Sequence, residues 1–68
     1  MTKYELGRAL AAEREAKLDN YDTPEGEACA DREDAIGREI EAGGGWDEEV
    51  ERGYSDAKRD YAAERAGR

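Results

Sequence analysis

The sequence predicts an all-α fold of three helices, spanning about residues 3–20, 24–42 and 47–66. Three observations lead to this prediction. Helix-start signals stand at three places, apolar residues recur at helical spacing after each of them, and no segment alternates polar and apolar residues as a strand does. A chain of 68 residues is one small domain, residues 1–68. We expect the helices to form a small bundle, or a helical hairpin with a third helix docked on it.

The first helix begins with a capping-box pattern, in which Thr2 is the N-cap and Glu5 follows three residues later. Its apolar side carries four large side chains: Leu6, Leu10, Leu18 and Tyr21. Arg14 and Lys17 interrupt the same stripe. We expect these two bases either to extend past the apolar surface to solvent or to meet acids of the second helix.

The second helix follows a clear break at residues 20–24. Thr23 as the N-cap and Pro24 at the first helical position are strong start signals. One side of this helix carries an apolar seam with one acid in it: Cys29, Glu33, Ile36 and Ile40. The opposite side is acidic, with Arg38 as the one base among four acids: Glu27, Asp31, Asp34 and Glu41. The helix is therefore amphipathic, with a thin apolar seam and an acidic back.

Three glycines, Gly43–Gly45, end the second helix by supplying a residue for the left-handed conformation of a helix C-cap. They lack the flanking pattern of a phosphate-binding loop, so we interpret them as a turn. Asp47 is the expected N-cap of the third helix. The third helix carries a seam with heptad-like 4-3-4 spacing: Val50, Tyr54, Ala57 and Tyr61.

Small residues stand four apart in each expected helix: Gly7 and Ala11, Gly26 and Ala30, and Gly53 and Ala57. Such pairs allow helix backbones to approach closely. Chains rich in alanine also produce them by chance, and we favour that explanation here.

The middle of the chain is strongly acidic. Residues 19–51 hold thirteen acids and two bases, whereas the two flanking segments are slightly basic, and the whole chain carries a net charge of −8. This charge argues against direct binding of nucleic acid or of an anionic membrane. The acidity has a second explanation, in which it serves solubility or reflects a salt-loving source.

The side chains that most enzymes need are scarce. The chain has no histidine, and its one serine, Ser55, lies in a helix without a base nearby. We therefore predict no catalytic residue, no cofactor site, no metal site and no enzymatic activity. Cys29 is the one cysteine, so an intrachain disulfide is excluded, and we interpret it as a packing residue. No apolar run suggests a signal peptide or a membrane span, so we expect a cytoplasmic protein.

The acidic middle segment predicts a binding module for a basic protein surface, such as that of a nucleic-acid-binding protein. Carboxylates three or four residues apart on a helix start from Cβ atoms about 5–6 Å apart, near the spacing of phosphates along a nucleic-acid strand. The predicted acidic face consists of Glu27, Asp31, Asp34, Glu41, Asp47, Glu48, Glu49 and Glu51. Trp46 and Tyr21 flank the segment and are the predicted aromatic anchors. In size and charge the chain resembles small acidic bacteriophage proteins that inhibit host nucleic-acid machinery, including anti-CRISPR proteins and DNA mimics.

The alternative is a small structural or regulatory subunit that oligomerises, with the acidity conferring solubility. Few large apolar side chains are present, and a second copy or another protein would complete the core. The residues expected to form either the core or the oligomer seam are Leu6, Leu10, Cys29, Ile36, Ile40, Val50, Tyr54 and Tyr61.

Overall fold

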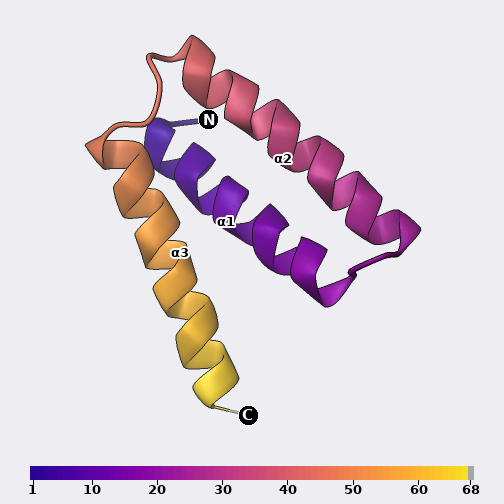
Figure 1. Cartoon of the computed structure of the whole chain (residues 1–68). Helices are drawn as coiled ribbons and strands as arrows, with labels where there is room; N and C mark the ends of the chain where they lie inside the picture. The colour runs from indigo at the N-terminus through magenta and orange to yellow at the C-terminus, as the bar shows by residue number, and fades with distance from the viewer. Residues whose placement is uncertain (68) are drawn as a thin grey trace.

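The computed structural model describes residues 1–67, and this part of the chain contains three helices and no strand (Figure 1). They are α1 (Lys3–Asp19), α2 (Pro24–Ala42) and α3 (Glu48–Ala66). The predicted all-α fold is confirmed. Each helix begins and ends within one residue of its predicted bounds, because the start and stop signals act locally.

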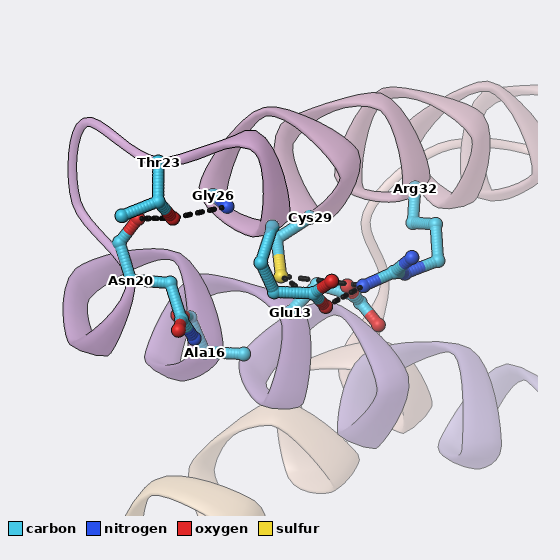
Figure 2. A network of polar contacts seen from close by, with 8 residues as sticks. Glu13, Ala16, Asn20, Thr23, Gly26, Cys29 and Arg32 are labelled. Carbon is cyan, nitrogen blue, oxygen red and sulfur yellow. Dashed lines mark hydrogen bonds and ion pairs between the residues drawn. The ribbon is translucent and has the colours of Figure 1, made fainter.

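The caps form as the sequence indicates. The Thr2 hydroxyl accepts a hydrogen bond from the Glu5 N–H at 3.1 Å, and the Glu5 carboxylate accepts one from the Thr2 N–H at 2.9 Å. At the start of α2, the Thr23 hydroxyl accepts from the Gly26 N–H at 3.1 Å and donates to the Asn20 carbonyl at 2.5 Å (Figure 2). The bonds from the backbone N–H groups satisfy donors that the start of a helix leaves without partners, and the bond from the Thr23 hydroxyl satisfies a carbonyl at the end of α1.

The three glycines after α2 take different backbone conformations as they end the helix. Gly43, the C-cap, has a φ of −88°, and the positive φ values belong to Gly44 (110°) and Gly45 (90°). The Gly44 N–H donates to the Glu41 carbonyl at 3.1 Å and the Gly45 N–H to the Ile40 carbonyl at 2.9 Å. This pair of bonds is the Schellman pattern, so the residue with positive φ lies one position later than the C-cap itself.

The helices pack in the order α2, α1, α3, with α1 in the middle (Figure 1). α2 runs antiparallel to α1, whereas α3 begins beside the start of α1 and runs in the same general direction. α2 and α3 hardly touch each other. The Cα atoms span 35 × 28 × 15 Å, so the array of helices is thinner in one direction than in the other two.

Two glycines bring α1 and α3 into backbone contact. A Cβ at Gly7 would clash with the Val50 carbonyl oxygen, and a Cβ at Gly53 would clash with the Tyr4 carbonyl oxygen. Ala11 and Ala57, one turn later on each helix, are both buried. The interpretation of these small residues as chance pairs is therefore wrong for α1 and α3.

The third small residue acts differently. A Cβ at Gly26 would clash with the Asn20 carbonyl oxygen, so this glycine permits the tight turn between α1 and α2. It takes no part in the packing of α3.

The hydrophobic core is small and lies where the three helices meet. It consists of Leu6 and Leu10 of α1, Ile40 of α2 and Val50 of α3, with Ile36 and Tyr54 partly buried against it. No side chain of a polar or charged residue is fully buried in the described part of the chain. None of the helices there has the length and apolar character needed to cross a membrane.

Candidate protein-interaction surface

The acids on the back of α2 form one straight stripe. Its members are exposed, and we call them the α2 acid stripe: Glu27, Asp31, Asp34 and Glu41. Steps of three, four and seven residues place them along one side of the helix, over a length of about 21 Å at about 1.5 Å per residue. Arg38 lies in the same stripe, between Asp34 and Glu41.

None of these four acids has a salt bridge or side-chain hydrogen bond to any residue within 1–67, so their charges remain available to a partner.

The bases of α1 are occupied by other acids. Lys3 pairs with Asp47 and Arg8 with Asp60, both at 2.8 Å. On the other side of α1, Arg14 and Lys17 both pair with Glu33 of α2. Because these bases are used in holding the helices together, they do not neutralise the α2 acid stripe.

Glu33 is the acid in the apolar seam of α2, and both interrupting bases of α1 bind it. Arg14 Nε lies 2.8 Å from one carboxylate oxygen and Lys17 Nζ lies 2.6 Å from the other. The hydrogen bonds from Lys17 and then Arg14 lower the pKa of Glu33 below its ordinary value. Of the two outcomes expected for Arg14 and Lys17, meeting acids of the second helix is the one observed.

Asp47 and Glu51, two members of the predicted acidic face, serve the fold. Asp47 caps α3 by accepting the Val50 N–H at 3.0 Å, and its salt bridge to Lys3 lowers its pKa. The Glu51 carboxylate accepts hydrogen bonds from Trp46 Nε1 at 2.7 Å and from the Ser55 hydroxyl at 3.2 Å. These contacts hold the start of α3, and they reduce what either acid offers to a partner.

Glu48 and Glu49 are exposed in the first turn of α3. Neighbouring residues on a helix point about 100° apart, so the two side chains leave α3 in different directions. α1 also separates α3 from α2 (Figure 1). The structure therefore does not bring the acids of α3 into line with the α2 acid stripe.

Trp46 lies beside the C-terminal end of the stripe. Its ring packs edge-on against the ring of Tyr54, with 5.4 Å between the two ring centres, and the residue is 48% exposed. It helps to line a surface groove of about 540 Å³ that also includes Asp34, Arg38 and Glu41 of α2. Its indole is thus fixed in orientation and accessible at the groove.

Tyr21 lies at the other end of the stripe, in the turn between α1 and α2, and is 82% exposed. Leu18, expected on the apolar side of α1, is 67% exposed as well, which corrects that expectation. α3 diverges from α1 toward this end (Figure 1), and Leu18 lies beside the α1–α2 turn, where it lines a surface hollow with Tyr21 and Thr23.

The residues expected in the core or in an oligomer seam divide into two groups. Leu6, Leu10, Cys29, Ile40 and Val50 are buried within this chain, whereas Ile36, Tyr54 and Tyr61 are partly exposed. Much of the Tyr54 ring is covered, because the guanidinium of Arg14 and the ammonium of Lys58 lie 5.4 and 5.5 Å from its centre. Ile36 and Tyr61 remain as candidates for a contact between copies.

Cys29 is fully buried between α1 and α2 (Figure 2). Burial raises the pKa of its thiol, and Arg32 Nη2 donates to the sulfur at 3.3 Å. Arg32 also binds Glu13 of α1 at 2.9 Å and Glu25 at 3.2 Å. These contacts of Arg32 were not predicted from the sequence. Their one local signal is that Glu25, Cys29 and Arg32 are spaced four and three residues apart on one side of α2.

The arrangement defines an acidic three-helix protein with a charged helix back and accessible aromatic side chains at both ends of it. Among residues 1–67, no three Cys, Asp or Glu side chains converge in a way that could hold a metal ion. Comparisons of the chain with protein-family models, with curated proteins and with solved structures give no match. What the surface does is therefore inferred from its geometry and charge.

Proposed function

We propose that this protein is a non-enzymatic binding module that docks the α2 acid stripe onto a basic surface of another protein. A surface that holds a nucleic-acid backbone has the matching chemistry, because its bases are spaced to meet successive negative charges. Occupying such a surface would inhibit the nucleic-acid machinery to which it belongs. The observation that carries the proposal is that four exposed acids of α2 stay unpaired within residues 1–67 while all four bases of α1 bind other acids.

Two double variants with equal net charge test this proposal. Asp31→Lys/Asp34→Lys reverses the centre of the stripe, and Asp19→Lys/Glu39→Lys reverses two exposed acids outside it. Each variant changes the net charge from −8 to −4. Circular dichroism would establish that both remain helical.

The immobilised protein is incubated with a cell lysate at low and at high salt, and captured proteins are identified by mass spectrometry. We expect capture of nucleic-acid-binding proteins that weakens with salt, that duplex DNA competes away, and that only the stripe variant loses. Capture that ignores salt, or that both variants lose equally, would contradict the proposal.

A second candidate function, assembly with copies of itself, is favoured by the open groove of about 540 Å³ beside Trp46. Leu10 and Ile40 contribute to its lining, and a second copy of the chain would cover it. Light scattering measures the mass directly. A dimer or larger species would support assembly, and a monomer at high concentration would exclude it.

A further inference from the structure

An apolar hollow lies at the end of the α2 acid stripe where α1 turns into α2. It has a volume of about 410 Å³, and Leu18, Tyr21 and Ala30 form its apolar lining. Leu18 and Tyr21 are among the most exposed large apolar side chains of residues 1–67. Two such side chains beside one hollow form a surface that another apolar group would cover favourably.

The rim of this hollow is negative. Glu27, the first member of the α2 acid stripe, lines it together with Asp22, and neither acid has a salt bridge within the described residues. Lys17 also lines the hollow, but its ammonium is bonded to Glu33 at 2.6 Å. An occupant with a base next to an apolar group therefore matches both the lining and the rim.

We propose that the hollow receives a large aliphatic side chain from a basic helical segment of the partner, whose lysines or arginines then lie along the α2 acid stripe. This proposal rests on the proposed function and adds what the partner must carry: an apolar residue at one end of a row of bases. The straight stripe of about 21 Å matches a helix that lies along α2.

The expected strength of each contact explains why an apolar anchor is needed. Each exposed ion pair strengthens binding by no more than about fivefold, so four of them leave a complex in roughly the millimolar range. Burying one leucine side chain strengthens binding by about tenfold to a hundredfold. The charges select and orient the partner, and the anchor supplies the affinity.

Two synthetic helical peptides of about 18 residues serve as probes, since that length spans the stripe. Both carry lysines at alternating steps of four and three residues, and they differ at one terminal position, which is leucine in one and serine in the other. Binding to the full chain is measured by calorimetry at two salt concentrations, and the contacted residues are mapped by NMR chemical shifts. Leu18→Ser is the test variant, and Ala63→Ser, an exposed position on α3, is the control.

We expect the leucine peptide to bind the unmodified chain at least about tenfold tighter than the serine peptide. In Leu18→Ser the two peptides should bind about equally, with the salt dependence of binding unchanged. In Ala63→Ser the preference for the leucine peptide and the salt dependence should both be retained. If the unmodified chain binds the two peptides equally and salt still weakens binding, the proposed role of the hollow is wrong and the proposed role of the α2 acid stripe stands. Binding that responds neither to salt nor to Asp31→Lys/Asp34→Lys, or no binding of either peptide at low salt, would overturn the stripe and the hollow together.

Discussion

The carbonyl oxygen of Tyr4 occupies the space in which a Cβ of Gly53 would lie. The reciprocal contact joins Gly7 to the carbonyl of Val50, so each helix presses its backbone against a glycine of the other. This contact places Val50 in the core and brings the start of α3 beside the start of α1. The close packing of α3 on α1 therefore depends on two residues without side chains.

Gly53→Ala should destabilise the protein. An alanine in the middle of a helix normally stabilises it relative to glycine, but here the added methyl would force the two backbones apart at a cost of about 1–3 kcal/mol. Gly37→Ala is the matched control, because a Cβ there meets nothing within 4 Å, and it should stabilise by about 0.5–1 kcal/mol. Urea unfolding followed by circular dichroism measures both. Equal effects of the same sign would show that the glycine contact does not exist.

The helix bounds were predictable because their signals are local. Thr2, Thr23 and Asp47 each cap a helix within three residues of themselves, and Gly44 ends one by its backbone conformation. The central position of α1 was not predictable, because it depends on contacts such as that of Tyr4 with Gly53, far apart in the chain.

The candidate surface was predictable only in part. The spacing of the α2 acid stripe follows from the period of a helix, so the sequence alone places its four acids together. Whether an acid has a partner is not given by this spacing. The salt bridge of Asp47 to Lys3 joins residues far apart in the chain, and the bond of Glu51 to Trp46 depends on how the turn before α3 is folded. The exposure of Leu18 likewise depends on tertiary packing, because its side chain lies at an open hollow beside the α1–α2 turn.

Glu33 should make stability depend on pH in acid. Its pKa is lowered in the folded chain, so the unfolded chain binds more protons, and this contribution is present above the ordinary pKa of 4.5 and is lost as the pH falls below it through the lower folded value. Glu33→Gln should lower the free energy of unfolding at neutral pH by about 1 kcal/mol. The loss stays this small because solvent screens the half-exposed Arg14 and Lys17. The variant and the unmodified chain should converge in stability at low pH. Glu27→Gln, which removes an unpaired acid, is the control; a similar loss there would contradict the assignment.

Arg38 should weaken the binding of a basic partner, because it places one positive charge inside the α2 acid stripe. Arg38→Glu should therefore strengthen binding of the lysine peptides by up to about fivefold and increase its salt dependence. Arg52→Glu is matched in charge, since both variants take the net charge from −8 to −10, and Arg52 is an exposed residue of α3. An equal gain in both variants would mean that overall charge, and not the stripe, attracts the peptide.

Cys29 should report the separation of α2 from α1. Its thiol is fully buried with a raised pKa, so a disulfide reagent at neutral pH reacts only when the two helices part. Arg32→Ala removes the bond to Glu13 that ties α2 to α1, and should speed labelling of the thiol about threefold to tenfold. Arg52→Ala removes an exposed base from α3 and should leave the rate unchanged. The rate is followed by absorbance and compared with that of the chain unfolded in guanidinium, in which all variants should react alike. If the folded chain reacts as fast as the unfolded one, the cysteine is not buried between α1 and α2.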